Sequence, residues 1–184
     1  MAVRDDIMAV VKGYEEIADA GILPTGELVF EPGFRKYCED NVCGCYNANY
    51  SCPPYCGTPE EMKNRALRYD SSLTVRTVWD MPDMGDVQRL TACKKRHNDI
   101  SYEIIDALLS MGLEVDAMLA GHCDRCEGGC LMPRGKPCTR NYKVYSCASA
   151  YCLDLTRTCR RMDMPFAFEK DRVSYYSTFL YNEK

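Results

Sequence analysis

The 184-residue chain has little histidine and tryptophan, with two histidines, His97 and His122, and one tryptophan. Two histidines are too few for a metal site built mainly from histidine, and they leave few histidine ligands for a mixed His/Cys zinc site. The formal net charge is −4, with both signs interspersed along the chain. This balance gives no indication of nucleic acid or an anionic membrane as a partner.

Long apolar runs are also missing. No stretch approaches the roughly 20 apolar residues of a membrane-spanning helix. Asp5 and Asp6 interrupt the region where an export signal would need an apolar run. We therefore expect a cytoplasmic protein that contacts neither membrane nor nucleic acid. The chain also shows no phosphate-binding glycine loop, no dinucleotide fingerprint and no hydrolytic triad, so no catalytic residue is assigned.

Cysteine is the residue in excess, with thirteen copies. In a reducing compartment a disulfide framework would not persist, and an odd number of cysteines cannot all pair. The remaining common use for so many thiols is metal ligation. A ligand set of nearly pure sulfur suits iron–sulfur clusters or zinc held by four thiolates. The length is enough for one domain with a hydrophobic core, and we expect residues 1–184 to form a single domain.

One compact cysteine loop is expected within residues 121–140. Its four cysteines follow the spacing C-x2-C-x3-C-x7-C and are Cys123, Cys126, Cys130 and Cys138. Gly128 and Gly129 suit a loop that must aim sulfurs inward. Structural zinc usually takes paired cysteine knuckles separated by a longer spacer. Three close cysteines and a more distant fourth are nearer to ferredoxins, so we predict a [4Fe–4S] cluster here, with zinc as the alternative.

A second cysteine-rich loop is expected at residues 35–57. It shows neither helical nor alternating periodicity, so its order must come from something that it wraps. Two prolines follow Cys52 and fix the backbone beside a sulfur without helical support. The candidate metal ligands are Cys38, Cys43, Cys52, Cys45 and Cys56. Three ligands would leave an open coordination position, as in catalytic sites, whereas a fourth would favour an electron carrier.

Apolar periodicity predicts a small α/β or α+β sheet with helices packed on it. The expected helices are 3–20, 59–69, 83 or 86 to 112, and 153–162, and the expected strands are 27–31, 73–79, 113–119 and 173–181. Cys93 and His97 lie on the apolar face of the longest helix and are expected to be core residues. If that helix joins strands 73–79 and 113–119 as parallel neighbours, both end at one edge, where we expect the two cysteine loops to converge.

A wider pattern connects the two loops. It begins with Arg35-x2-Cys38-x4-Cys43-x2-Tyr46-x5-Cys52-Pro53-Pro54 and continues with Ala120-Gly121-x-Cys123-x2-Cys126, Pro137-Cys138, Ser146, Leu153-Asp154-Leu155 and Tyr175-Tyr176. In this pattern the chain resembles a family of prokaryotic proteins described as predicted metal-binding proteins. The resemblance implies metal binding without implying a particular reaction.

The chain departs from the family pattern in two respects. Thr139 and Arg140 stand where the family usually places Arg and Pro close after its last cysteine. Five cysteines look like additions to the pattern: Cys45, Cys56, Cys147, Cys152 and Cys159. Each added cysteine either replaces a ligand or serves as a small apolar residue.

Two classes of function fit these observations. In the first, the protein is an electron carrier or a small reductase, an iron–sulfur-dependent oxidoreductase whose one or two [4Fe–4S] clusters serve a redox partner or a small-molecule substrate. In the second, it is a zinc-stabilised binding or scaffold module without catalysis. Colour separates the two classes, because iron–thiolate centres absorb visible light and zinc, with its filled d shell, does not.

Overall fold

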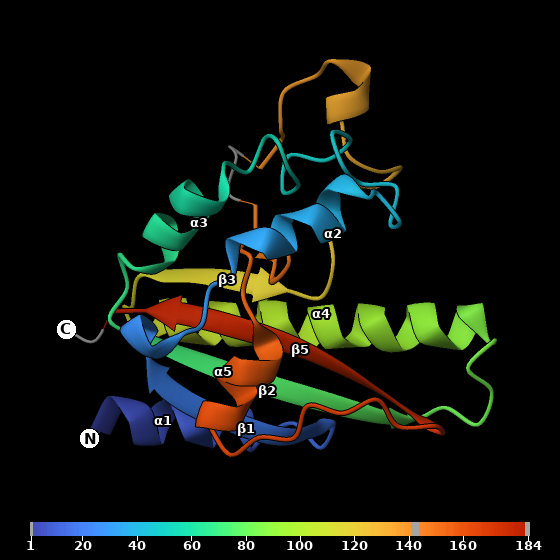
Figure 1. Ribbon diagram of the computed structural model, residues 1–184. Helices are drawn as coiled ribbons and strands as arrows, with labels where there is room; N and C mark the ends of the chain where they lie inside the picture. The colour runs from blue at the N-terminus through green and yellow to red at the C-terminus, as the bar shows by residue number, and fades with distance from the viewer. Residues whose placement is uncertain (1, 141–143, 183–184) are drawn as a thin grey trace.

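The computed structural model describes residues 2–140 and 144–182. Its centre is a five-stranded sheet with the strand order β1-β2-β5-β3-β4 (Figure 1). The strands are β1 (Ile17–Pro24), β2 (Ser71–Asp80), β3 (Val115–Leu119), β4 (Ser146–Cys147) and β5 (Arg172–Tyr181). β3 and β4 pair in parallel and the other neighbours pair antiparallel, so this is a mixed sheet of the α+β class.

The helices occupy the connections between the strands. They are α1 (Ala2–Val11), α2 (Arg35–Glu39), α3 (Pro59–Ala66), α4 (Val87–Ser110) and α5 (Leu155–Arg161), with short 3₁₀ turns η1 (Thr25–Glu27), η2 (Pro32–Phe34) and η3 (Met132–Arg134). α3 begins with a capping box, in which Thr58 Oγ1 accepts from the Glu61 amide and the Glu61 carboxylate accepts from the Thr58 amide. Within the described ranges, no helix combines the length and the apolar character that crossing a membrane requires.

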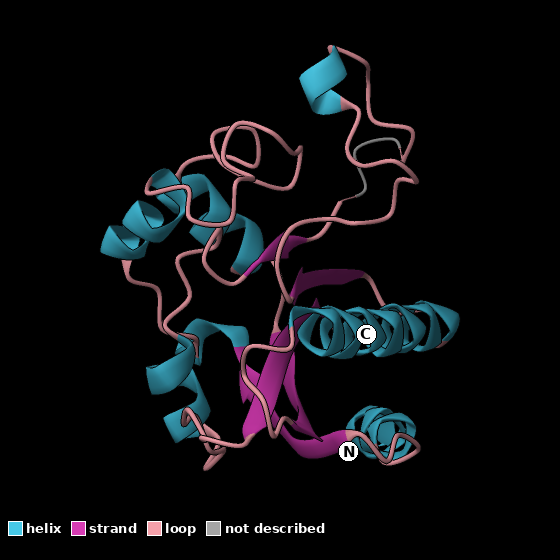
Figure 2. Ribbon diagram, turned by 90° about the vertical axis from the view of Figure 1, so that its right-hand side faces the viewer, coloured by secondary structure: helices cyan, strands magenta, loops and turns pink. Residues whose placement is uncertain are grey.

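Both faces of the sheet are covered, because successive side chains of a strand point to opposite faces. α1 and α4 lie on one face, and α3 and α5 lie on the other (Figure 2). The core under α1 and α4 contains Ile7, Val11, Ile100, Ile104, Leu108, Leu73, Val75, Ala117, Leu119, Phe179 and Tyr181. The intervening strand residues Met118 and Leu180 pack on the opposite face against Met62 and Ala66 of α3. The sequence prediction of strands 73–79, 113–119 and 173–181 and of the long helix is thereby confirmed.

The first segment corrects the predicted helix 3–20. α1 ends at Val11, and residues 17–24 form the edge strand β1, which pairs antiparallel with β2. Gly13 lies in the turn between them and weakens a continuous helix there. The hydrogen bonds of β1 come from β2, which is distant in sequence, so the tertiary partner overrides the local helical periodicity.

Two further expectations are wrong. Residues 27–31 do not form a strand, since their extended pairing is a single bridge between Phe30 and Leu153. β2 and β3 run in the same direction but are not neighbours, because β5 lies between them and pairs antiparallel with both. Along β5, all ten residues pair with β2, which gives the last strand the central place in the sheet.

A buried ion pair connects the helix that follows the first cysteine loop to the strand that precedes the second. Arg65 of α3 donates to the Asp116 carboxylate of β3 through Nε at 2.6 Å and Nη2 at 2.8 Å. The Tyr151 hydroxyl donates to the same carboxylate at 2.7 Å. The two parallel bonds from one guanidinium fix orientation as well as distance. These three side chains hold α3, β3 and the turn after β4 in one arrangement.

His97 of α4 is buried in a polar cluster within the core, as its place on the apolar face predicts. Its Nδ1 contacts Thr77 Oγ1 at 2.7 Å and its Nε2 contacts Ser177 Oγ at 2.7 Å. Ser101 Oγ donates to Ser177 Oγ at 2.9 Å, so hydroxyl groups partner both nitrogens of the ring, and the rings of Trp79 and Tyr175 pack beside it. Burial lowers the pKa of His97 to about 4, and the ring is neutral at physiological pH.

The depressed pKa of His97 makes the fold sensitive to acid. Between pH 6.5 and 4 the unfolded chain binds a proton at His97 that the native protein does not bind, so the free energy of unfolding falls as the pH falls. At pH 4, the depressed pKa of His97 lowers the free energy of unfolding by roughly 3 kcal/mol relative to neutral pH. We expect the difference in the free energy of unfolding between wild type and His97→Gln, measured by urea denaturation, to change across this pH range. A difference independent of pH would contradict the prediction.

Candidate metal centre

The two cysteine-rich loops lie above β3 in Figure 1, past that edge of the sheet, and they pack against each other. Ser51 Oγ accepts from the Cys123 amide at 2.9 Å, and Asn49 Nδ2 donates to the Cys123 carbonyl at 2.9 Å. The Cys45 thiol lies 3.0 Å from Nδ1 of His122. Ser51 and Asn49 are both buried. The predicted convergence of the loops is therefore confirmed, with the start of the second loop seated on the first.

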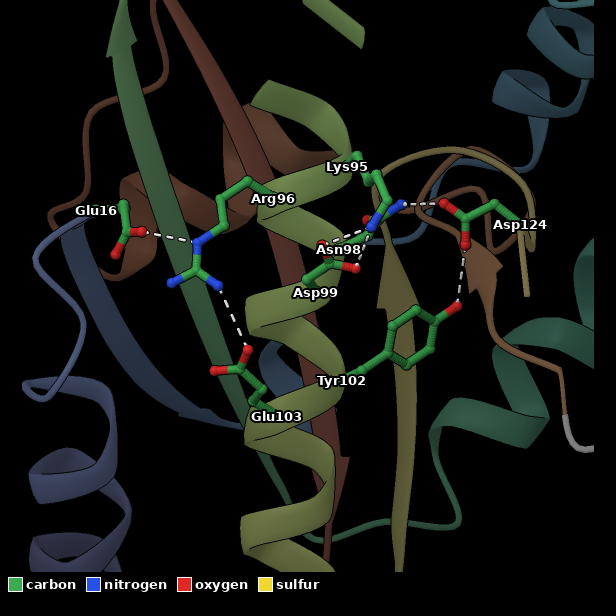
Figure 3. Close-up of polar contacts among 8 residues, drawn as sticks. All are labelled: Glu16, Lys95, Arg96, Asn98, Asp99, Tyr102, Glu103 and Asp124. Carbon is green, nitrogen blue, oxygen red and sulfur yellow. Dashed lines mark hydrogen bonds and ion pairs between the residues drawn. The ribbon is translucent and has the colours of Figure 1, made fainter. Parts of the chain in front are cut away.

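α4 holds the start of the second loop from the other side (Figure 3). Asn98 exchanges two hydrogen bonds with the backbone of Ala120, each 3.2 Å long, and its amide also lies 3.3 Å from the Asp124 carboxylate. The Tyr102 hydroxyl donates to Asp124 at 3.4 Å, and the Arg125 guanidinium lies 4.6 Å from the centre of the Tyr102 ring. The backbone that delivers the second loop is thus fixed to the longest helix.

A cavity of about 430 Å³ lies at the junction of the loops. Cys38 enters it from α2, while Cys43 and Cys52 enter it from the irregular backbone that follows. The other lining residues are Tyr37, Val42, Tyr46, Pro53, Lys94, Gly121, His122, Cys147 and Ser149. The structure therefore brings together three of the five ligand candidates of the first loop.

Cys147 is one of the five cysteines added to the family pattern but is not among the predicted ligands. It belongs to β4, which pairs with β3 through the register Leu119–Cys147, and this register places it in the cavity wall. Its interaction with Cys38 lowers the pKa of Cys147, whereas the pKa of Cys38 is raised by the same contact and by burial. The one signal in the sequence was its position directly after Ser146, a residue of the wider pattern.

Cys45 and Cys56 lie elsewhere. The Cys45 thiol contacts the Cys43 carbonyl at 3.3 Å as well as the His122 ring. Cys56 lines a different depression, together with Glu61 and Arg65. Neither cysteine is among the described residues that line the cavity containing Cys38, Cys43 and Cys52.

The second loop folds around its four cysteines with little regular structure. All four are partly buried, and the charges of Cys126 and Cys138 add to burial in raising the pKa of Cys123. Arg134 donates to the carbonyls of Gly128 and Gly129, at 3.2 and 3.3 Å. Both glycines have positive φ, which the predicted inward-facing turn requires. The loop thus brings Cys123, Cys126 and Cys138 within electrostatic range of one another.

The cysteine side chains of the two loops do not converge on a single point that one metal ion could occupy. Across residues 2–140 and 144–182, no three His, Cys, Asp or Glu side chains are grouped closely enough to hold one metal ion in common. Burial raises the pKa of Cys52 to about 12 and also raises that of Cys123. These thiols are protonated at neutral pH in the absence of a cation, so metal binding would have to displace their protons.

Arg35 is the first residue of α2 and precedes Cys38 by three residues. It is 8 % exposed, and its guanidinium donates to the carbonyls of Gly57 at 2.8 Å and Ala150 at 2.9 Å. Its Nε has no hydrogen-bond partner within the described residues, and none of the ion pairs found there involves it. A buried positive charge without a carboxylate is costly. This charge and the surrounding thiols fit an anionic metal–thiolate group.

Lys94 of α4 lies on another wall of the same cavity, beside Gly121 and His122. Gly121 has a φ of +87°, so glycine is favoured here by backbone conformation, and the end of the Lys94 side chain lies close to its Cα. Burial, and then the charge of Lys94, lower the pKa of His122. The imidazole beside Cys45 is therefore neutral at physiological pH.

The family comparison agrees with this donor chemistry. The family model DUF2284, described as predicted metal-binding protein, matches residues 21–181. The chain belongs to this predicted metal-binding family. The match spans both cysteine loops and all five strands, apart from the first residues of β1. No curated protein and no solved structure matches the chain.

The contact between the loops depends on Ser51. Ser51→Ala removes the acceptor of the Cys123 amide and one partner of the Asn49 side chain. We expect a loss of about 1–3 kcal/mol in the free energy of unfolding, because buried polar groups lose partners. Hydrogen exchange of the amides in residues 121–126 should also become faster. The control, Ser110→Ala on the exposed side of α4, should change neither quantity. Unchanged exchange in Ser51→Ala would show that the loops are held together by other contacts.

Proposed function

We propose that the protein is an iron–sulfur redox protein of the cytoplasm, an electron carrier or small reductase, in which residues 1–184 form one domain around both cysteine loops. The observation that carries the proposal is the direct packing of the two thiol-rich loops, including the 3.0 Å contact between Cys45 and His122. Metal centres held in these two loops would lie close to each other, and a short separation favours electron exchange between them.

The arrangement of the thiols favours iron–sulfur clusters over zinc. Four sulfurs bound to one zinc ion at about 2.3 Å lie only about 3.8 Å apart, so they must converge on a point. The thiols of the first loop instead line a cavity of about 430 Å³. A polynuclear cluster contains several irons and bridging sulfides, and it occupies space between its thiolates. Because these thiols line a cavity and do not converge on one point, their arrangement supports a cluster.

The second centre would be held by Cys123, Cys126, Cys130 and Cys138. Two arginines support this loop from within: Arg134 holds the carbonyls of Gly128 and Gly129, and Arg140 donates to the Arg125 carbonyl at 3.0 Å. Both guanidinium groups bond to backbone carbonyls of the loop whose thiols would carry negative charge when bound to metal. Hydrogen bonds and charges around the sulfurs are among the factors that set a cluster's reduction potential.

The state of the cysteines supports a reducing compartment. All thirteen lie in the described ranges, and each is a free thiol. Ligands must remain reduced and become deprotonated to bind metal, which a cytoplasmic thiol pool permits. The partner of the redox centre would be another electron-transfer protein or a small-molecule substrate.

Cys126 and Cys159 provide a matched test of the second centre. Cys126 lies in the second loop, whereas Cys159 is buried on α5, away from both loops. In protein purified without oxygen, Cys126→Ala should lose the iron and sulfide of one centre and part of the visible absorption, because the other thiolates lose a shared cation. Cys159→Ala should keep wild-type iron and sulfide.

Two outcomes of this measurement would contradict the proposal. Zinc in place of iron and sulfide, in colourless wild-type protein, would support the zinc-stabilised scaffold instead. Full metal content in both variants would show that the second loop is not the metal site.

A further inference from the structure

We propose that Cys147 is the fourth thiolate ligand of the first centre, with Cys38, Cys43 and Cys52, and that the buried guanidinium of Arg35 neutralises the resulting anionic group. This inference rests on the proposed function, because it requires a metal centre in the first loop. It deepens that function by assigning a ligand from outside the two cysteine loops.

The position of Cys147 follows from the sheet. β4 pairs in parallel with β3, and the register Leu119–Cys147 places the thiol at the end of β3, where the second loop begins. Cys147 shares the wall of the 430 Å³ cavity with three thiols of the first loop: Cys38, Cys43 and Cys52.

The two alternative fourth ligands are less well placed. Cys45 contacts the His122 ring at 3.0 Å and the Cys43 carbonyl at 3.3 Å, and it is not among the described residues that line the cavity. Cys56 has its thiol 3.8 Å from the Gly57 carbonyl and lines a depression beside α3. Cys147 therefore completes the set by its position in the cavity wall, although it is the most distant of the three in sequence.

Arg35 connects the two parts of the chain that carry these thiols. Its carbonyl partners are Gly57, at the end of the first loop, and Ala150, in the turn after Cys147. Neutral carbonyl groups satisfy its N–H donors without neutralising its charge. Four thiolates carry more negative charge than a zinc(II) ion or an oxidised cubane cluster carries positive charge, so the bound centre is anionic. An anionic centre in the cavity supplies the counter-charge that Arg35 lacks among the described residues.

Four protein thiolates close the coordination shell. A metal with an open position binds water or substrate, whereas a closed shell stabilises the fold or transfers electrons. The assignment of Cys147 therefore favours the electron carrier over a reductase that binds its substrate directly on the first centre.

Cys147→Ala and Cys152→Ala test the ligand. Cys152 is a matched control because it is buried in the same turn, outside the described wall of the cavity. In full-length protein purified without oxygen, we expect Cys147→Ala to lose the metal of one centre and Cys152→Ala to retain the wild-type amount. Metal-free wild-type protein would contradict the proposed function itself. Normal metal in the wild type and in Cys147→Ala would overturn only the present inference.

Alkylation of the wild type provides a second measurement, which holds even if Cys147→Ala fails to fold. Iodoacetamide is applied to the metal-loaded protein and to the same protein after metal removal, and the modified cysteines are located by mass spectrometry. We expect Cys147 to be protected in the loaded protein and modified after metal removal, together with Cys38. Equal modification of Cys147 in both states would overturn its assignment as a ligand.

The role of the Arg35 charge is tested by Arg35→Gln and Arg35→Lys. Removal of a charge that supports a metal ligand set costs roughly 10–100-fold in metal affinity. We expect that loss in Arg35→Gln, measured by competition with a chelator. Arg35→Lys should recover most of the affinity, because lysine keeps the charge while losing the forked contact with the two carbonyls. Equal loss in both variants would show that Arg35 acts only through its hydrogen bonds, and wild-type affinity in Arg35→Gln would exclude a role for its charge.

Discussion

The buried carboxylate of Asp116 is the point on which the arrangement of the candidate site depends. It accepts two hydrogen bonds from Arg65 and one from Tyr151. Arg65 lies on the helix that follows the first cysteine loop, Asp116 on the strand that precedes the second, and Tyr151 in the turn that follows Cys147. One ionic cluster thus orients the chain segments that deliver all three groups of thiols. Because breaking a buried pair leaves a charge without compensation, this arrangement resists displacement.

Burial keeps the thiols of Cys52 and Cys123 protonated until a cation displaces their protons. Cys52 is buried, Cys38 and Cys147 influence each other's pKa, and the charges of Cys126 and Cys138 act on Cys123. Deprotonated sulfurs this close would repel one another, and a metal centre removes that repulsion. The buried guanidinium of Arg35 bonds to the Gly57 and Ala150 carbonyls, and we propose that it supplies opposite charge to the first centre. The protein therefore prepares the donors and part of the counter-charge, and we propose that the metal provides the rest.

The errors in the predicted fold have a common cause. The segment 17–24 becomes a strand because β2 offers it a partner, and β5 separates β2 from β3 because its ten residues pair with β2 along their whole length. Both outcomes depend on hydrogen bonds between residues far apart in the chain, which local periodicity does not contain. By contrast, α4 and the strands around it were predicted correctly, since their apolar patterns follow from burial against the sheet.

The sequence by itself determined the chemistry of this protein: cysteine spacing, scarce histidine and the family pattern all indicate a thiolate metal site. It also determined that two loops hold most of the candidate ligands, because those cysteines are neighbours in the chain. Only the tertiary structure decided that Cys147 lies beside the first loop and that Arg35 connects this loop to the turn after Cys147. Their positions follow from the pairing of β4 with β3 and from the carbonyls of Gly57 and Ala150. Such contacts join distant residues, and they exist only once the sheet has brought those residues to one edge.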